Sequence, residues 1–371
     1  MKKRILFVQN RLTFGGTSSL IMFIVRNLSD EYIFDLFCYE DGAPELEKEF
    51  IGYGGSIIKD KRLHCSDKAS GKLKQYRLKF FGGIQHIFKN NILANKYCVI
   101  HCFEEFSSSY YLKASASLGI KKRIVHFCND QKQKRKMNFI AKLLRRKETK
   151  LINKYATNIV GDSFKSFSDA LDSSKATMIL DPIDKRFAFS NSTPNNLTLV
   201  QVGSFCDNKN QLFSLSVLDI LRKKYGLHNS NLIMVGPCSK ENFGYKKEIE
   251  NKIIELDLID NVFIKQATLD LPQIFSESSY MIFPSKKESF GMVLIEAQAC
   301  GLYCFSSYAA AKETDLGGVT FVELNEGAEN WAKIIYNFYS INHGKKNKYI
   351  VSKHSQETIR KEFLKLYEQA R

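Results

Sequence analysis

Residues 281–301, with the sequence MIFPSKKESFGMVLIEAQACG, constrain the fold of this chain more than any other stretch. They open on a short apolar run typical of a buried strand, which Pro284 stops. A polar loop follows, and then apolar residues at helical spacing predict a helix that ends at Gly301. A strand, a loop and a helix in this order bind phosphates in α/β proteins, because the first helical turn points its free N–H groups at the ligand. Glu288 in the loop and Glu296 in the helix are placed to reach groups beyond such a phosphate.

Short apolar runs, each followed by a helical pattern, recur along both halves of the chain and predict doubly wound parallel sheets. Because 371 residues are enough for two cores, we expect two Rossmann-like domains, over residues 1–190 and 191–351, joined at the Pro/Asn/Ser-rich stretch 190–196. The predicted strands lie at residues 4–9, 32–39, 56–58, 97–101, 123–127 and 157–160, and then at 197–202, 231–235, 261–265 and 280–283.

Glu288 and Glu296 are separated by seven residues, and the whole block around them resembles the E-x7-E signature of retaining GT-B glycosyltransferases. The similarity is greatest to family 4, the glycosyl transferases group 1, which uses nucleotide-sugar donors. The sequence LIEAQACG, followed by KETD at residues 312–315, is similar to the branch that builds capsule, O-antigen and exopolysaccharide. The resemblance implies the α/β GT-B architecture, in which two doubly wound Rossmann-like domains face each other across a cleft. It also implies that a C-terminal helix at about residues 352–371 packs back on the first domain.

The loop at residues 203–210, GSFCDNKN, is similar to the G-R-F-x-x-x-K-N loop of the same family. The resemblance implies that Lys209 binds the donor phosphates and that Gly203 and Ser204 belong to the donor site. The family arginine is Ser204 in this chain, which removes one cation from the site. The basic residues available to replace it are Arg11, Lys286 and Lys287.

The resemblance also assigns roles within residues 281–301. Glu296 would accept hydrogen bonds from the ribose hydroxyls, as a carboxylate does in other nucleotide sites, and Glu288 would bind hydroxyls of the donor sugar. The backbone N–H groups at the start of the helix would bind the phosphates. These N–H groups belong to Phe290, Gly291, Met292 and Val293.

Two features of the first half complete the predicted site. Gly15 and Gly16 follow the first predicted strand without a full G-x-G-x-x-G pattern. They resemble the family's Gly-Gly turn, whose amides face the donor diphosphate, although a tight turn that only starts a helix is the alternative. Residues 123–129, RIVHFCN, look like the family strand that ends in a histidine in contact with the transferred sugar. We therefore predict that His126 is catalytic together with Lys209 and Glu288, whereas we expect a structural role for His101.

The formal net charge of +16 calls for an anionic partner or another explanation. Residues 131–154 hold ten Lys or Arg and a single acidic residue, Glu148, with apolar residues between them. No nucleic-acid motif or interleaved aromatic platform is present, so nucleic acid is not an expected partner. An anionic membrane surface fits a basic and apolar segment better, and the lipid-linked acceptors of the family favour it. The alternative is a solvated basic helix packed on its own domain.

The composition bears on membrane spans, disulfides, metal sites and the location of the protein. No apolar run reaches the length of a membrane span, and no signal-peptide h-region follows residues 1–4. The nine cysteines include no C-x-x-C pair, which favours reduced thiols in a cytosolic protein. No cluster has metal-ligand spacing, so we expect neither a metal nor another cofactor. We expect a cytoplasmic protein, peripheral on the inner face of the cell membrane.

These observations predict a metal-independent hexosyl- or N-acetylhexosaminyl-transferase. It would move a sugar from a nucleotide sugar, most simply a UDP-sugar, to a lipid-linked glycan of a bacterial surface polysaccharide. One alternative is another GT-B enzyme, such as a UDP-sugar epimerase. A second alternative is a non-catalytic, basic surface-binding protein that keeps the fold, and the uncharged Ser204 is the feature that favours it.

Overall fold

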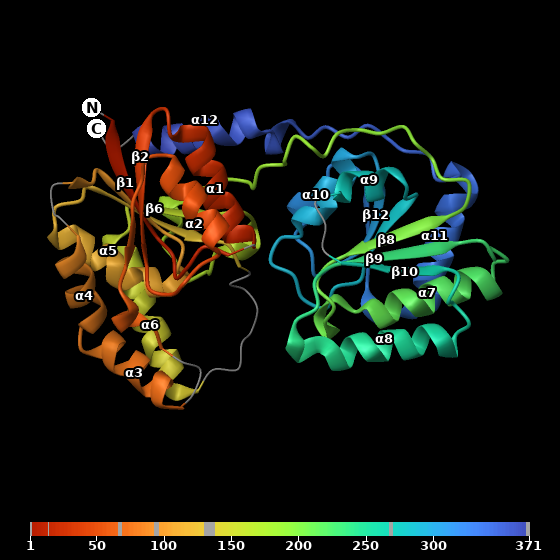
Figure 1. Cartoon of the computed structure of the whole chain (residues 1–371), viewed down its shortest axis with the longest axis horizontal. Helices are drawn as coiled ribbons and strands as arrows, with labels where there is room; N and C mark the ends of the chain where they lie inside the picture. Colours follow the sequence, from red (N-terminus) through yellow and green to blue (C-terminus); the bar gives the residue numbers. More distant parts are fainter. Residues whose placement is uncertain are drawn as a thin grey trace. The chain divides into compact units, whose positions relative to one another are not determined.

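Two sheets of parallel strands with the same strand order form the framework of the chain (Figure 1). A computed structural model describes residues 2–13, 15–65, 69–92, 96–129, 138–266 and 270–368. The chain divides into a first unit, Met1–Pro182 with Gln356–Arg371, and a second unit, Ile183–Ser355. The predicted pair of doubly wound α/β units is therefore confirmed.

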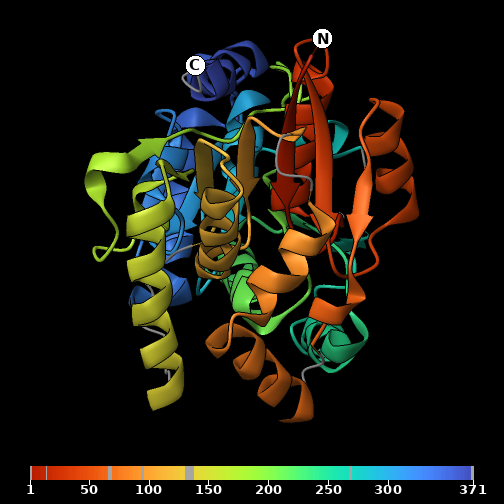
Figure 2. The ribbon, with the colours of Figure 1, turned by 90° about the vertical axis from the view of Figure 1, so that its left-hand side faces the viewer.

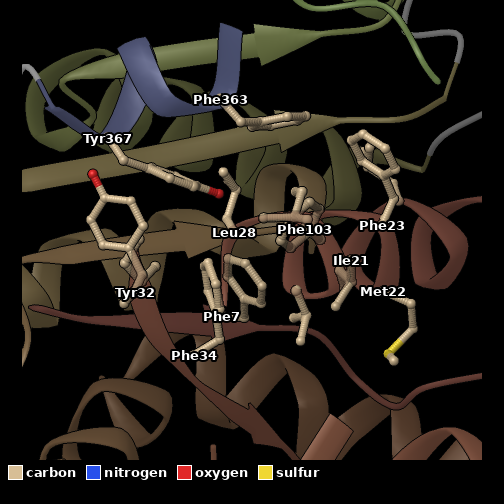
Figure 3. Packing of buried hydrophobic residues seen from close by; sticks show 14 of the residues in the cluster. Phe7, Ile21, Met22, Phe23, Leu28, Tyr32, Phe34, Phe103, Phe363 and Tyr367 are labelled. Carbon is tan, nitrogen blue, oxygen red and sulfur yellow. The ribbon is translucent and has the colours of Figure 1, made fainter. Parts of the chain in front are cut away.

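The first unit is built on the sheet β3-β2-β1-β4-β5-β6-β7. Its strands are β1 (Lys3–Val8), β2 (Tyr32–Cys38), β3 (Ile57–Lys59), β4 (Val99–Cys102), β5 (Lys122–Phe127), β6 (Asn158–Gly161) and β7 (Ala176–Met178). Its helices are α1 (Gly16–Leu28), α2 (Pro44–Gly52), α3 (Ala69–Phe80), α4 (Gly83–Asn91), α5 (Ser108–Ser117), α6 (Phe139–Tyr155) and α12 (Gln356–Glu368). Helices α1 and α12 share one hydrophobic core on one face of this sheet, and α4, α5 and α6 pack together in a second core (Figure 2). Figure 3 shows Tyr367 and Phe363 reaching from α12 into the same core as Phe7 and Phe103.

The second unit is built on the sheet β10-β9-β8-β11-β12-β13. Its strands are β8 (Thr198–Val202), β9 (Asn231–Val235), β10 (Val262–Lys265), β11 (Tyr280–Phe283), β12 (Tyr303–Ser307) and β13 (Val319–Val322). Its helices are α7 (Gln211–Lys223), α8 (Phe243–Glu255), α9 (Leu271–Ser276), α10 (Met292–Ala299) and α11 (Gly327–Asn342). Helices α7, α8 and α11 bury their apolar sides around Trp331 on one face of this sheet.

The strand order predicts where each sheet would bind a ligand. In both sheets the chain first adds strands in one direction and then returns past its starting strand, so the order reverses between β1 and β4 and between β8 and β11. The loops that leave these neighbouring strands then diverge, and ligands of doubly wound sheets bind in the crevice between them. In the second unit the two loops are residues 203–210 and 284–291, the same two loops for which the sequence predicts donor binding.

The division between the units lies ahead of the predicted boundary at residue 190. Residues 183–190 belong to the second unit because they bond and pack there. The Ile183 N–H donates to the His354 carbonyl at 2.9 Å, and the ring of Phe187 lies 6.0 Å from that of Phe275. Residues 356–368 return to the first unit, where the Arg360 side chain donates to the Asn27 carbonyl.

A buried carboxylate ties the amino end of the first sheet together. Asp35 of β2 accepts hydrogen bonds from the Arg4 guanidinium (2.8 Å), the Tyr97 hydroxyl (2.8 Å) and the Ser56 N–H (2.8 Å), and Lys96 lies 3.1 Å away. Burial alone would raise the pKa of Asp35, but these donors outweigh it and hold the pKa below the ordinary value. One side chain thus links β1, β2 and the segments that enter β3 and β4.

Among the described residues no helix combines the length and the low charge that a membrane span requires. All nine cysteines are free thiols, and several are buried within the sheets.

Replacing Asp35 by Asn should destabilise the first unit by ~2–4 kcal/mol at pH 7, because two cations lose their buried counter-charge. The wild-type carboxylate has a lowered pKa, so its contribution is complete above about pH 4 and is lost as the pH falls further. Asp35→Asn should therefore lack this acid-sensitive component. Far-UV circular dichroism in urea should show the loss, whereas fluorescence of the single tryptophan, Trp331 in the second unit, should not change.

The control is Glu49→Gln, which removes an exposed ion pair with Arg26 and should change stability by less than ~1 kcal/mol. Equal effects of the two substitutions would contradict the role assigned to Asp35.

Candidate functional site

The loops after β8 and β11 are held to each other at the carboxyl edge of the second sheet. The strands themselves pair in parallel, with Met281 opposite Val200. Beyond the strands, the Lys286 N–H donates to the Asn208 carbonyl at 2.8 Å, and the Asn208 side chain donates to the Lys287 carbonyl at 2.8 Å. These reciprocal bonds make one continuous surface from two loops that are about eighty residues apart in sequence.

Lys209 and Glu288 meet on this surface. Their side chains form an ion pair, and both are mostly buried, with 20% and 17% of the side chain exposed. The Lys209 ammonium also lies 5.0 Å from the centre of the Phe283 ring, and the Lys209 carbonyl accepts a hydrogen bond from Gln201. The structure thus brings together two of the three predicted catalytic residues, with the cation held between a carboxylate and an aromatic face.

Gly203 explains how the Lys209 side chain reaches this position. The Gly203 φ of +155° is one that residues with a side chain rarely adopt. A Cβ atom there would lie 3.1 Å from the Lys209 Cδ and Cε atoms, so the stem of the lysine lies directly over the glycine. Gly236 closes the other side, because a Cβ on it would be 2.0 Å from the Gly203 carbonyl oxygen. Gly236 thus has no room for a side chain, and at Gly203 a side chain would be strained by the positive φ and would crowd the lysine stem.

Ser204, which stands where the resemblance predicts arginine, is exposed, and its carbonyl accepts a hydrogen bond from the Gln211 side chain. Of the basic residues considered as replacements, Lys286 lies on the same surface and pairs with Asp207 at 2.6 Å. Arg11 belongs to the first unit, where it pairs with Glu40 at 3.3 Å.

The start of α10 presents backbone donors beside this pair of loops. Phe290 is buried, and Gly291 caps the helix with a positive φ of +105° that favours glycine. The Leu294 N–H bonds back to the Gly291 carbonyl at 2.9 Å. The earlier N–H groups of the first turn, from Met292 and Val293, have no carbonyl partner within an α-helix and are the natural donors to an anion.

Glu296 lies further along α10 in a different environment. It is half-buried, and burial raises its pKa to about 7, with a further increase from Asp184 that Arg186 partly offsets. Within the described residues, no hydrogen bond joins Glu296 to Lys209 or Glu288. The charged residues that affect the pKa of Glu296 are Asp184 and Arg186, which belong to the segment that opens the second unit.

In the first unit, Gly15 caps α1 and Gly16 is its first residue. Gly15 is extended, with φ −167°, and a Cβ on Gly16 would meet no atom within 4 Å. Neither backbone strain nor lack of space requires glycine here. Both glycines are exposed, and the Thr13 N–H donates a hydrogen bond to the Ser18 hydroxyl at 3.0 Å.

His126 is fully buried in β5. Its Nδ1 lies 3.2 Å from Nε2 of His101, and its ring stacks on Phe103 at 5.4 Å. Burial lowers the pKa of His126 to about 3, so the imidazole is neutral. His101, expected to be structural, is therefore in direct contact with the histidine that the resemblance assigns to the sugar.

No group of three or more histidine, cysteine or carboxylate side chains that could hold a metal ion occurs in the part of the chain that the structure describes.

The chain is similar to known proteins in the region that holds these loops and over most of its length. Residues 182–311, which include both loops and α10, match the family described as Glycosyl transferases group 1. The chain is 22% identical to EpsF of Bacillus subtilis, a protein named as a glycosyltransferase, over 90% of this chain and 87% of that protein. It is 25% identical to the capsular polysaccharide biosynthesis glycosyltransferase CapH of Staphylococcus aureus, over 79% and 78% of the two chains.

Among solved structures, Anabaena Alr3699/HepE in complex with UDP is similar over the full length of both chains, with a TM-score of 0.74 and 16% identity. The predicted fold class is thereby confirmed: each half is a doubly wound Rossmann-like unit, as in the GT-B glycosyltransferases.

Replacing Glu296 by Gln should stabilise the second unit. A carboxyl whose pKa is raised on folding costs stability once the pH exceeds its unfolded pKa, and the cost grows until the folded pKa is passed. The gain should thus be absent below about pH 4.5, increase up to about pH 7 and stay constant above it. At pH 8 it should reach ~1–3 kcal/mol, since one pKa unit corresponds to ~1.4 kcal/mol.

Unfolding followed by Trp331 fluorescence, which reports on the second unit, measures this gain. Glu250→Gln, which removes an exposed carboxylate of α8, is the control and should change stability by less than ~1 kcal/mol. A Glu296→Gln protein that is less stable than wild type at pH 8 would contradict the raised pKa.

Proposed function

We propose that the chain is a retaining, metal-independent glycosyltransferase of family 4 that transfers a sugar from a UDP-sugar to a lipid-linked glycan acceptor. The acceptor would belong to a bacterial surface polysaccharide, that is, capsule, O-antigen or exopolysaccharide. The observation that carries the proposal is the Lys209–Glu288 pair, on two loops that meet at the strand-order reversal within the region matched to the group 1 family. The names of the relatives, and the UDP and UDP-glucose complexes of the Anabaena protein, support the donor class.

The donor would lie along the surface formed by the two loops and the start of α10. Its diphosphate would accept hydrogen bonds from the Lys209 ammonium and from the Met292 and Val293 amides, with Gly203 allowing the close approach. Glu296 would accept from the ribose hydroxyls. Because bound hydroxyl donors favour the carboxylate form, donor binding should lower the raised pKa of Glu296.

Glu288 would exchange one partner for another. In the free protein it neutralises Lys209. When a diphosphate takes the ammonium, the carboxylate is released to accept hydrogen bonds from hydroxyls of the donor sugar. The ion pair thus keeps both groups oriented before the donor arrives, which reduces the entropy lost on binding.

Transfer requires stabilisation of the negative charge that develops on the UDP leaving group as the glycosidic bond breaks. Lys209 and the helix amides would supply it from fixed positions, without reorganisation during the reaction. Retention would follow from attack on the same face, with the acceptor proton passing to the leaving phosphate. A double displacement would need a carboxylate nucleophile at the anomeric carbon, and the donor-binding roles proposed for Glu288 and Glu296 would leave neither available for it.

A basic and apolar face on the first unit would hold the enzyme at an anionic membrane. Of the basic stretch 131–154, residues 131–137 lie outside the described residues, and the rest is α6 with the loop before it. Lys147 of α6 donates to the Lys79 carbonyl of α3, which joins the two helices (Figure 2). The exposed apolar residues of this face are Phe80, Phe81, Phe139, Ile140 and Leu143. The exposed basic residues are Lys74, Arg77, Lys142, Arg146 and Lys150.

A hollow of about 590 Å³ opens at the α3–α4 side of this face, with two cations and apolar walls that would suit an anionic lipid headgroup. It is lined by Ser70, Lys74, Arg77, Leu78, Phe81 and Gly83. On this proposal the protein is cytoplasmic and peripheral on the inner face of the membrane.

Lys209→Ala should weaken UDP binding by about 10- to 100-fold, the range expected for one charge-assisted hydrogen bond. Calorimetric titration of UDP into the full-length protein with EDTA present measures it. The control is Lys223→Ala, which removes an exposed lysine paired within α7 and should bind UDP as wild type does.

A panel of UDP-sugars then tests catalysis through slow donor hydrolysis and transfer. Conversion of a UDP-sugar to its epimer would support the epimerase alternative. Absence of UDP binding to wild type would leave the non-catalytic, surface-binding alternative.

The double substitution Phe81→Ser, Phe139→Ser should reduce binding to vesicles that contain phosphatidylglycerol by at least about tenfold. The reason is that burial of each exposed ring in the bilayer would contribute ~1–2 kcal/mol to the free energy of binding. Co-sedimentation measures binding, which should also fall at high salt. Phe243→Ser, in the second unit, is the matched control. Equal binding to neutral phosphatidylcholine vesicles would contradict an electrostatic membrane face.

A further inference from the structure

Two ion pairs cross between the two loops of the candidate site. Lys209 of the loop after β8 pairs with Glu288 of the loop after β11. In the reverse direction, Lys286 of the loop after β11 pairs with Asp207 of the loop after β8, at 2.6 Å. Each loop therefore supplies one cation and one carboxylate to these pairs, and each cation is neutralised by the opposite loop.

The two pairs differ in their exposure to water. Only 20% of the Lys209 side chain and 17% of the Glu288 side chain are exposed, compared with 43% for Lys286 and 76% for Asp207. Water screens an exposed pair, so little free energy is lost when such a pair opens. A diphosphate has more charge and more acceptor oxygens than a carboxylate, and it binds an ammonium more strongly. A diphosphate on this surface can therefore displace the Asp207 carboxylate from Lys286.

The charge of the proposed ligand calls for a second cation. A nucleoside diphosphate carries more than a single negative charge at neutral pH. In the proposed donor site Lys209 supplies one full positive charge, and the amides at the start of α10 supply only partial charges. Ser204, where the resemblance predicts arginine, is exposed and uncharged. The proposed donor site therefore has room for one more positive charge.

Of the three basic residues that could supply this charge, Lys286 has the contacts that fit. Its N–H donates to the Asn208 carbonyl at 2.8 Å, and its ammonium reaches Asp207. Both ends of Lys286 thus contact the loop after β8, at the two residues that precede Lys209. Lys287 is exposed, and within the described residues no ion pair joins it to either loop. Arg11 belongs to the first unit.

We propose that Lys286 is the second cation that binds the donor diphosphate, and that Asp207 holds its ammonium in place until the donor arrives. The inference rests on the proposed function, because it concerns the diphosphate of the same donor. Lys286 would supply the charge that Ser204 lacks, from the opposite loop. Asp207 is then a competitor of the donor, since its carboxylate and the diphosphate bind the same ammonium in turn. Once released, the exposed Asp207 carboxylate is solvated by water.

Substitutions of the two partners should change UDP affinity in opposite directions. Lys286→Ala should weaken UDP binding about tenfold, the effect of one charge-assisted hydrogen bond. Asp207→Asn should tighten it by about threefold, because the ammonium is already free and a nearby negative charge is gone. Calorimetric titration of UDP into the full-length protein measures both, with EDTA present so that no divalent ion supplies the missing charge.

An ion pair that only joined the two loops would give a different result. Both substitutions would then break the same contact, and they would change UDP affinity in the same direction by similar factors. That result would overturn the inference. An equal loss of affinity in Lys287→Ala would also overturn it, because the total charge of the surface would then matter rather than Lys286. Lys223→Ala, which removes an exposed lysine of α7, is the control and should bind UDP as wild type does.

A rescue experiment tests whether Lys286 takes the place of the arginine. Ser204→Arg, added to Lys286→Ala, should restore UDP affinity to within about threefold of wild type, because arginine binds phosphate well and position 204 is exposed. Failure of the rescue would contradict the shared role of the two positions. UDP binding that depends on Lys209 but not on Lys286 would leave the proposed function standing and overturn this inference alone. Absence of UDP binding to wild type would contradict both.

Discussion

The reversal of strand order between β8 and β11 is the constraint on which the candidate site depends. It places two loops next to each other that the sequence keeps far apart, and hydrogen bonds between Asn208, Lys286 and Lys287 fix them as one surface. Lys209 and Glu288 are neighbours only for this reason. The Lys209 stem packs directly over Gly203, whose positive φ favours glycine, and Gly236 has no room for a side chain because it packs against the Gly203 carbonyl.

The two units use burial in different ways. In the second unit, partial burial of Glu296 raises its pKa, which means that the ionised carboxylate is destabilised in the folded protein. Hydrogen bonds from the hydroxyl groups of a ligand would stabilise the ionised form. In the first unit, burial lowers the pKa of His101 and of His126 and keeps both imidazoles neutral. The opposite end of the same sheet holds Asp35, whose donors fully compensate its charge. Hydrogen bonds and cations thus balance the charge of Asp35 at one edge of this sheet. His126, whose Nε2 has no hydrogen-bond partner among the described residues, lies towards the other edge, where doubly wound sheets bind ligands.

The sequence predicted much of the fold because parallel strands buried on both faces read as short apolar runs. It missed β7, β12 and β13, since β7 is exposed and the polar residues of the other two obscure the pattern. The residues around E-x7-E located the donor loops, but the Lys209–Glu288 pair follows from sheet order, which no local pattern contains. The contacts of His101 with His126 and Tyr367 join segments up to 266 residues apart, so no local sequence pattern predicts them.

A crystal structure of the protein with UDP, grown in the presence of EDTA, would show which residues bind the donor diphosphate. We expect the diphosphate to lie within hydrogen-bonding distance of Lys209 Nζ and of the Met292 and Val293 amides. Glu288 should have left Lys209, and Glu296 should contact the ribose. UDP bound elsewhere in the second unit, with the Lys209–Glu288 pair intact, would contradict this expectation.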